Sequence, residues 1–477
     1  MAERKAENFR QWQKHNRGMD NSKQINSSDD MISQLPDPIL HSILSRIPAT
    51  EEVIRTSILS TRWRYLWTSL SSIDIDITRR LNPHERFKNN KFDKFMFHIL
   101  ENTHPDLNSF RLHCGNYFTM LPVSRWIQAA TMRKVKSLDL KFCLKNESIN
   151  VPNCVVTCGS LEELRLHLFG CCLRLPDCNG FSVIRVLELD NVRLSNCGIV
   201  TDFLKNCPLL EELSLKNLEV SQSRFGVDRM FRMGENVNRD IRISQSPFGG
   251  YGMFSIGEIN VSRKIQICCP KLVFLELEGD IGHYKCIGLD SLKKAVIKPN
   301  KPLSRLMVNT LHELFDGISR VESLSINPFV IIECIRASFP NLKTLELTTI
   351  IDEFPMDNLI QILKSHPHLE ALHLIIKDVF SYQMRNSFGF AHEKLEEVET
   401  RRILTRHLKK VEFLEFFGHT SLSMARWLLL YGDVLEEMVF NWGNKDKYSQ
   451  KSAEAMKIMS SFHKASSTVK LVTHFKE

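Results

Sequence analysis

The side chains in this sequence that could bind a metal ion are thiols and a histidine close together in the chain. Cys268 and Cys269 precede His283 and Cys286, and these four side chains are of the types that bind zinc. Two adjacent cysteines fit a tetrahedral site poorly, and this pair directly precedes a leucine-rich stretch in which small core residues are expected. We therefore interpret the cysteines as core residues and expect neither a bound metal nor a cofactor.

Candidates for catalysis are equally few. His366 and His368 flank Pro367 in an expected turn, which favours two solvated loop residues over an acid–base pair. The sequence contains no phosphate-binding GxxxxGKS motif, no GxSxG nucleophile elbow and no HExxH zinc motif. We therefore expect a protein without a catalytic site, whose function depends on surfaces that bind partners.

Composition places the chain among soluble globular or repeat proteins. Its 477 residues are too many for one compact core, and no run of eighteen apolar residues or signal-peptide core is present. We expect a nuclear or cytoplasmic protein, in which the 13 cysteines remain reduced, and a disordered polar tail over residues 1–28. The net charge of +8 is spread along the chain, which disfavours a nucleic-acid partner without excluding one.

Residues 30–67 contain the clearest local pattern, which predicts three short helices. Asp37 and Pro38 suit the start of the first helix, with Asp37 as its N-cap, and Trp63, Leu66 and Trp67 fall on one face of the last. Three helices of this length carry more apolar surface than they can bury among themselves. The surplus could pack against the rest of the chain or against a partner, and the pattern alone leaves both open.

The run LPDPILHSIL followed by TSILSTRWRYLW resembles the F-box of plant F-box proteins, with prolines, tryptophans and spacings matched together. In that family the segment docks on a Skp-type adaptor of a cullin–RING ubiquitin ligase. Glu51, Glu52 and Thr61 depart from the family pattern, which bears on affinity more than on docking. The resemblance implies docking or packing roles in adaptor binding for Leu35, Pro36, Ile39, Leu40, Ile43, Leu44, Leu59, Trp63, Leu66 and Trp67.

A Leu-x-x-Leu-x-Leu motif recurs along most of the remaining chain. Successive motifs are separated by 26 residues (161 − 135), 21 residues (342 − 321) or 27 residues (369 − 342), which is the period of leucine-rich repeats. Alternate residues of a strand point to opposite faces, so the second and third leucines are expected in the core. Motifs start at Val135, Leu161, Ile184, Leu210, Leu272, Val321, Leu342, Leu369 and Leu408, with weaker copies at Leu107, Leu292 and Leu435.

Two regions depart from this repeat. Leu210 and Leu272 are 62 residues apart (272 − 210), and residues 221–263 between them lack periodicity. They could form a loop that contacts a target or a degenerate repeat with a loop, and both interpretations stay open. From about Leu395, the strand, helix and strand pattern of HLKKVEFLEFFGHTSLSMARWLLLYGDVLEEMVFNW resembles the FBD region that ends many plant F-box proteins with leucine-rich repeats.

These patterns predict an α/β (α+β) solenoid: a three-helix F-box followed by an irregular leucine-rich-repeat arc. Parallel strands are expected on the concave face and helices or turns on the convex face. The expected organisation is a disordered tail (1–28), an F-box (29–75), a linker or first helical element (76–103), the repeats (104–394) and the FBD-like region (395–477).

The outward residues of the repeat strands are the candidates for binding a target protein. Together with Lys216 and Thr344, the candidates contain seven acidic residues and two basic residues, Arg165 and Lys216. We hypothesise that they bind a basic segment of the target, with Phe274 as an apolar anchor. Alternatively, glutamate is simply a common solvated residue on such strands. The candidates are Glu163, Arg165, Glu188, Asp190, Glu212, Phe274, Glu276, Glu278, Glu346 and His373.

The resemblance implies a non-catalytic receptor subunit of an E3 ubiquitin ligase, which binds Skp-type adaptor, and through it cullin and RING subunits, at one end. A target protein would bind the repeats, and ubiquitin transfer would gain from proximity alone. Two alternatives stay open: a scaffold that never presents a substrate, and a nucleic-acid-binding protein that uses basic residues of segment 221–263.

Overall fold

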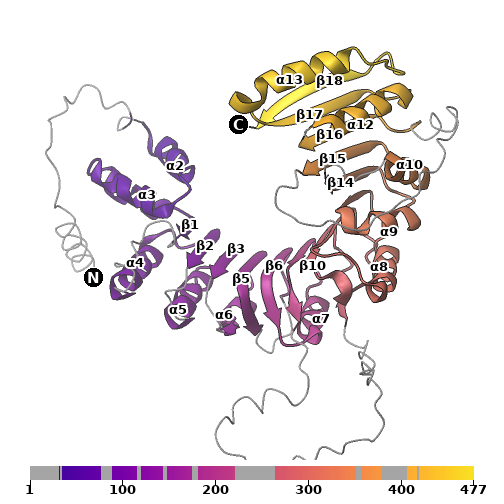
Figure 1. The fold of residues 1–477 in the computed structure, drawn as a ribbon. Helices are drawn as coiled ribbons and strands as arrows, with labels where there is room; N and C mark the ends of the chain where they lie inside the picture. The colour runs from indigo at the N-terminus through magenta and orange to yellow at the C-terminus, as the bar shows by residue number, and fades with distance from the viewer. Residues whose placement is uncertain are drawn as a thin grey trace, which may run out of the picture. The chain divides into compact units, whose positions relative to one another are not determined.

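The structure of the chain is a computed structural model, which describes residues 32, 35–76, 89–114, 120–142, 148–174, 181–220, 264–350, 356–377, 406–415 and 418–476. It divides into two compact units, Met1–Leu70 and Ser71–Glu477 (Figure 1). In the described part of the chain, no helix combines the length and the apolar character needed to cross a membrane. The tail at residues 1–28 lies outside the described residues.

The first unit consists of short helices: α2 (Asp37–Ser45), α3 (Thr50–Arg55) and two 3-10 helices, η1 (Thr56–Ile58) and η2 (Trp63–Ser69). The predicted capping role of Asp37 is wrong, since Pro36 occupies the N-cap and Asp37 lies in the first turn. Its carboxylate instead accepts hydrogen bonds from Arg62, whose Nη2 is 2.5 Å from Oδ1 and also donates to the Leu35 carbonyl at 2.6 Å. Arg62 thereby ties the start of α2 to the segment that leads into η2.

The second unit is built on one long sheet, in which every recorded strand pair is parallel. Each predicted motif starts two residues before a strand; Leu161, for example, precedes a strand that begins at Glu163. The repeat prediction is therefore confirmed. In sheet order the strands are β1 (Ser72–Asp76), β2 (Ser109–Cys114), β3 (Ser137–Phe142), β5 (Glu163–Arg174), β6 (Val186–Leu194), β7 (Glu212–Lys216), β10 (Phe274–Gly279), β12 (Lys294–Pro299), β13 (Ser323–Ile326), β14 (Thr344–Ile350), β15 (Ala371–Lys377), β16 (Lys410–Glu415), β17 (Glu437–Asn444) and β18 (Lys470–Lys476).

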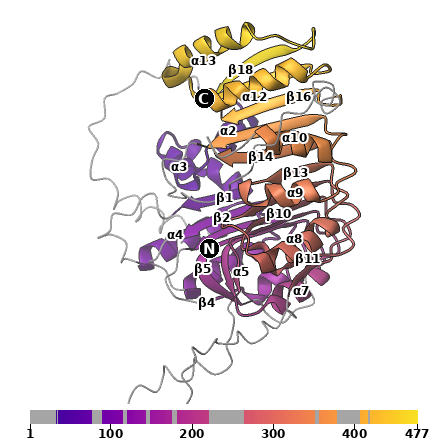
Figure 2. The same cartoon turned by 45° about the vertical axis from the view of Figure 1, so that its right-hand side comes forward.

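Helices connect the strands and lie along one side of this sheet, where α8, α9 and α10 follow one another (Figure 2). Apolar side chains of the strands, such as Leu164, Leu166, Leu345 and Leu347, are buried between the sheet and the helices. The helices are α4 (Asn89–Asn102), α5 (Met120–Thr131), α6 (Asn153–Val156), α7 (Cys197–Lys205), α8 (Arg305–Gly317), α9 (Ile331–Arg336), α10 (Met356–Ser365), α12 (Gly418–Tyr431) and α13 (Lys445–Ser460). The side of the sheet away from them is called the open face below.

The sheet is continuous across the interruption of the repeat, because β7 pairs directly with β10. Segment 221–263 lies outside the described residues, so neither interpretation of it is tested. Where the described chain resumes, β9 (Ile265–Ile267) pairs with β11 (Tyr284–Cys286) in a small second sheet. The N–H of Gln266 donates to Thr201 Oγ1 of α7 at 3.0 Å, so the resumed chain is fixed to the preceding repeat.

The strands at the two ends of the sheet were predicted from the sequence with different success. At the N-terminal end, β1 pairs with β2, although its residues fall within the segment assigned above to the F-box. At the C-terminal end, α12 and β17 follow the strand, helix and strand order expected of the FBD-like region, and β18 closes the sheet. The expected start of that region at Leu395 lies outside the described residues.

Candidate partner-binding surfaces

The residues predicted to bind the adaptor divide into a buried and an exposed group. Five are buried within the first unit and cannot contact a partner directly: Leu40, Leu44, Trp63, Leu66 and Trp67. Four are exposed: Pro36, Ile39 (46%), Ile43 (39%) and Leu59 (64%), while Leu35 is half-buried. The buried group builds the unit, and only the exposed group is available for docking.

Helical spacing explains this division. Leu40 and Leu44 are four residues apart and form the buried stripe of α2, while Ile39 and Ile43 form an adjacent stripe that stays exposed. A helix that packs by one stripe leaves the second for another molecule. Adaptor binding by these side chains stays a prediction.

Three exposed apolar residues of the first unit were missed from the sequence. Ile58 is 80% exposed, Tyr65 is 61% exposed and Ile32 is 56% exposed, values comparable with that of Leu59. The adjacent pair Ile58–Leu59 could have indicated an exposed apolar side chain. Successive residues of a helical turn point in different directions, and one small unit cannot readily bury both.

On the open face, the strand register places outward side chains in rows that cross the sheet. The row through the middle of the strands, called the second row, alternates in charge as far as Glu188. The next row, called the third row, contains two histidines, each with an acidic residue on one neighbouring strand and Lys141 on the other. The second row contains Asp74, Arg111, Asp139, Arg165, Glu188, Ser214 and Glu276. The third row contains Asp76, His113, Lys141, His167, Asp190, Lys216 and Glu278.

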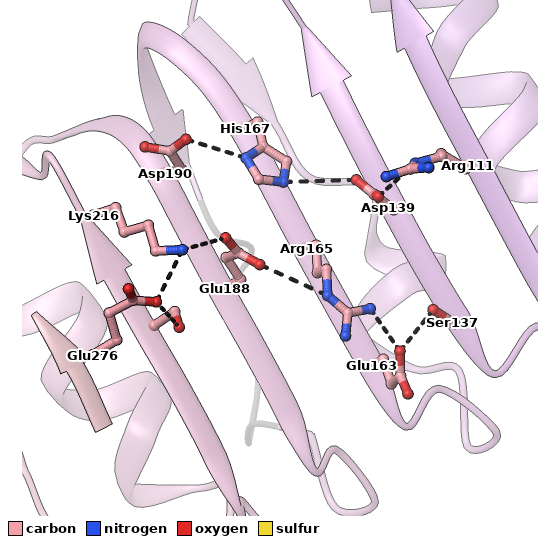
Figure 3. Close-up of polar contacts among 11 residues, drawn as sticks. Arg111, Ser137, Asp139, Glu163, Arg165, His167, Glu188, Asp190, Lys216 and Glu276 are labelled. Atoms are coloured by element: carbon pink, nitrogen blue, oxygen red, sulfur yellow. Dashed lines mark hydrogen bonds and ion pairs between the residues drawn. The ribbon is translucent and has the colours of Figure 1, made fainter. Parts of the chain in front are cut away.

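Side chains of the second row form ion pairs between neighbouring strands (Figure 3). Arg111 Nε is 2.9 Å from Asp139 Oδ2, and its Nη1 is 3.5 Å from Asp74 Oδ2. Arg165 lies between Glu163 (2.6 Å) and Glu188 (3.7 Å). Opposite charges on adjacent strands stabilise this order of strands, whereas like charges at the same positions would destabilise it.

The third row continues the same network (Figure 3). His167 lies 3.3 Å from Asp190 and 3.8 Å from Asp139 through its two ring nitrogens, and His113 Nδ1 is 3.2 Å from Asp76. Lys216 links two acidic side chains on both neighbouring strands, with Nζ 3.1 Å from Glu188 and 2.9 Å from Glu276.

The network shifts the pKa values of several of its members, among them Glu163 and Lys216. Burial alone would raise the pKa of Glu163, but hydrogen bonds from Arg165 and Ser137 lower it below its ordinary value. Burial alone would lower the pKa of Lys216, but its contacts with Glu276 and Glu188 raise it. Both groups are therefore held in their charged forms at neutral pH.

The predicted target-binding residues do lie on the open face, but they do not form a bare acidic surface. Glu163, Arg165, Glu188, Asp190 and Glu276 belong to the network above. The acidic excess came from counting the outward residues of six strands, which left out the strands that carry Arg111, Lys298 and Lys410. Target binding by any of these residues stays a prediction.

The remaining candidates lie further along the face. Glu346 accepts a hydrogen bond from Ser325 at 2.6 Å and lies 3.6 Å from Lys298, and His373 is 3.8 Å from Glu412. Glu212 is exposed at the start of β7, and Phe274 and Glu278 are half-buried on β10. None of these reaches the network through an ion pair among the described residues.

A further row, which we call the rim row, lies just before the strands. Each of its N–H groups donates to the carbonyl of the preceding member, and the charges alternate in sign with one apolar interruption at Val273. The second residue of each motif carries this alternating charge, so the sequence contained the signal, but we missed it. The rim row consists of Lys136, Glu162, Arg185, Glu211, Val273, Lys293, Glu322, Lys343, Glu370, Lys409 and Glu436.

Neighbours in the rim row also pair through their side chains. Arg185 contacts Glu211, Lys343 Nζ is 3.1 Å from Glu322, and Lys409 Nζ is 3.4 Å from Glu370. All of these side chains are more than a third exposed, so each pair contributes at most about 1 kcal/mol to stability.

Cys269, Cys286 and His366 lie in the core, but Cys268 is exposed, so its interpretation as a core residue is wrong. No group of three or more potential metal ligands occurs within the described ranges. Burial raises the pKa of Cys269 and of Cys286 to about 12, which keeps these thiols protonated and unlike the thiolates that bind zinc. The predicted solvation of His366 is wrong: it is 3% exposed and packs against Phe339, because the turn after α10 folds inward there.

Comparisons with known proteins agree with this architecture. A model of the F-box domain matches residues 32–74, and a model described as FBD-associated F-box protein At5g56370, LRR repeats, matches residues 123–232. Neither description names a catalytic domain. The F-box match covers all described residues of the first unit, and the repeat match covers β3, β5, β6 and β7, four of the seven strands that carry the ion-pair network.

Among curated proteins, the chain is similar to the F-box/FBD/LRR-repeat protein At1g51370 of Arabidopsis thaliana, with 31% identity over 193 residues. That alignment covers 40% of this chain and 41% of the relative, so it spans about two fifths of the relative's length. Longer alignments reach the putative F-box protein At3g58860 (29% identity, 72% of this chain, 74% of the relative) and the FBD-associated F-box protein At5g22730 (25%, 87% and 88%), both of Arabidopsis thaliana. The chain therefore carries an F-box and FBD-associated leucine-rich repeats, and its homologues are the F-box/FBD/LRR-repeat proteins of Arabidopsis.

Proposed function

We propose that this chain is the substrate-receptor subunit of a Skp–cullin–F-box ubiquitin ligase. Its first unit would bind a Skp-type adaptor, and the open face of its repeats would bind the protein to be ubiquitinated. The chain would supply no reacting group, and its contribution to the rate would be the high effective concentration of the target near the ubiquitin-carrying enzyme.

One observation carries this proposal: the F-box match coincides with a unit whose helices leave large apolar side chains exposed. Exposed isoleucine, leucine and tyrosine side chains on a unit this small are costly in water unless another molecule covers them. Their removal from water would supply the free energy of docking, while the buried leucines and tryptophans keep the docking residues in place.

Co-purification of the full chain with a Skp-type adaptor tests the first half of the proposal. The variant Leu59→Glu places a charge at a position that is 64% exposed, so the fold should be kept while adaptor affinity falls at least tenfold. Met132→Glu is the matched control, because Met132 is an exposed apolar residue (78%) of the second unit. Equal adaptor binding by wild type and Leu59→Glu would contradict the proposed docking role.

Ubiquitin transfer in a complex reconstituted with cullin and RING subunits tests the second half. A receptor should stimulate transfer to a protein that binds the repeats, and the Leu59→Glu variant should abolish this stimulation. Adaptor binding without transfer to any bound protein would favour a scaffold. Binding to RNA or DNA that weakens steeply with salt, in place of adaptor binding, would favour the nucleic-acid alternative.

A further inference from the structure

Phe274 and the rim residue before it, Val273, form an apolar pair between two pairs of charged residues. Val273 is 39% exposed and Phe274 is half-buried. On one neighbouring strand, Glu211 and Glu212 occupy the corresponding positions, and on the other, Lys293 and Lys294 do so. The two sides of the apolar pair therefore carry opposite charges.

Most of the charged residues around this pair are accessible to another molecule. Glu212, Lys293 and Lys294 are exposed, and no ion pair is recorded for Glu212 or Lys293 with a described residue. Lys294 Nζ lies 5.8 Å from the centre of the Phe274 ring, while Glu211 contacts Arg185. Further along β10, the ion pair of Lys216 with Glu276 marks where the self-paired network begins. The six residues thus form a small polarised site at the edge of that network.

Strand spacing fixes the kind of segment that would fit. β7 and β12 are two strand spacings apart, which is about 10 Å, and an extended peptide advances about 3.3 Å per residue. Alternate side chains of an extended peptide point to opposite faces, so the side chains that face the sheet are two positions apart. A peptide that crosses the strands can therefore place an apolar side chain over the middle strand, and the side chains two positions before and after it, about 13 Å apart, can reach the two charged pairs. Glu211 and Glu212 would repel a nucleic acid or an acidic segment, and Lys293 and Lys294 would repel a purely basic segment.

We propose that this site binds an extended protein segment in which a basic and an acidic residue, four positions apart, flank a large apolar residue midway between them. The basic residue contacts Glu211 and Glu212, the apolar residue packs on Val273 and Phe274, and the acidic residue contacts Lys293 and Lys294. The proposal rests on the proposed function in taking the bound segment to belong to the target protein, and it replaces the simple preference for basic segments predicted from the sequence.

A displayed library of random twelve-residue peptides, selected on the purified full chain, tests this site. We expect enrichment of a basic, an apolar and an acidic residue at alternate positions within five residues. Affinities of individual enriched peptides, measured by fluorescence anisotropy, should fall at least tenfold for Phe274→Ser and for Glu212→Lys. Glu212→Lys cancels the net negative charge of its side, since Glu211 remains, so the variant should also discriminate less against a peptide with acidic residues on both sides of the apolar residue.

Phe169→Ser is the matched control. Phe169 is another exposed phenylalanine of the same face, 47% exposed, with Lys141 Nζ 5.4 Å from its ring centre, but it lies far along β5 from the rim row. Its replacement should change affinity less than twofold. Thermal unfolding of each variant shows whether it is folded, and the charge variants keep the test decisive if Phe274→Ser unfolds.

The proposed site is overturned if no peptides are enriched, if enriched peptides carry charges of one sign only, or if Phe169→Ser weakens them as much as Phe274→Ser does. Adaptor binding is measured on the same preparations. Loss of adaptor binding with normal peptide selection would refute the ubiquitin-ligase proposal and leave this site standing. Normal adaptor binding without selected peptides would refute this site and leave the ubiquitin-ligase proposal standing.

Discussion

Asp280 fixes the turn that follows β10. Its Oδ1 accepts a hydrogen bond from the N–H of Gly282 at 3.2 Å, and its Oδ2 is 2.9 Å from Lys301 Nζ. Burial alone would raise the pKa of Asp280, but the hydrogen bonds from Lys301 and Gly282 lower it below its ordinary value. A carboxyl group whose pKa is lowered by folding stabilises the protein above the pKa of the unfolded chain and loses that effect as the pH falls through the folded pKa.

Asp280→Asn should therefore destabilise the protein at pH 7 by about 0.5–1 kcal/mol, since the amide can still accept from Gly282 but cannot pair with Lys301. The difference from wild type should shrink as the pH falls below about 3.9, the ordinary aspartate value. Urea unfolding at several pH values measures this difference. Asp290→Asn, which removes a pair that is more than two-thirds exposed, should have a smaller effect. A pH-independent difference for Asp280→Asn would contradict the role given to its charge.

At the scale of elements, the junction of β7 and β10 depends on close backbone approach. Gly279 ends β10 with φ +104°, and a Cβ atom there would lie 3.0 Å from Asn217 Cα and 3.1 Å from Asn217 N. Asn217 donates its N–H to the Glu278 carbonyl at 2.8 Å, so the two strand ends cannot move apart without losing that bond. Only glycine satisfies both the backbone conformation and the contact.

Gly279→Ala should accordingly destabilise the protein by about 1–3 kcal/mol. Gly159→Ala is the control, because no atom lies within 4 Å of its added Cβ and its φ is not positive, so it should be neutral or slightly stabilising. Chemical unfolding of both variants measures the difference, and similar midpoints for the two would show that the junction tolerates a side chain.

The strands could be predicted from the sequence because the repeat motif fixes both their period and their buried face. Leu161 and Leu342 each start a motif two residues before a strand, and even the weak copy at Leu292 does so. The pairing of Arg111 with Asp139 could not be predicted with the same ease, since it requires the strand order and register. In the F-box, helical spacing could not show which of Ile39 and Leu40 is buried, because both lie on apolar stripes.

For the whole second unit, parallel strands that contact only their neighbours imply that damage stays local. Leu345 of β14 is fully buried, so Leu345→Ala should cost about 2–5 kcal/mol through lost burial and a cavity. Amide hydrogen exchange should accelerate in β13, β14 and β15 and remain unchanged in β2 and β3. Thr344→Ala, an outward change on the same strand, should alter exchange little. Uniform acceleration across all strands would show that the sheet unfolds as one unit.

The alternating charges of the rim row also limit how such a chain can change its length in evolution. Loss or duplication of a single repeat between Lys293 and Glu436 would bring two like charges onto neighbouring positions of that row, whereas a change by two repeats would keep every neighbour opposite in sign. Val273 is the exception, since a neutral residue tolerates either sign beside it. This pattern therefore permits two kinds of change in length without electrostatic cost. One is the gain or loss of repeats in pairs, and the other is the gain or loss of an odd number of repeats next to Val273.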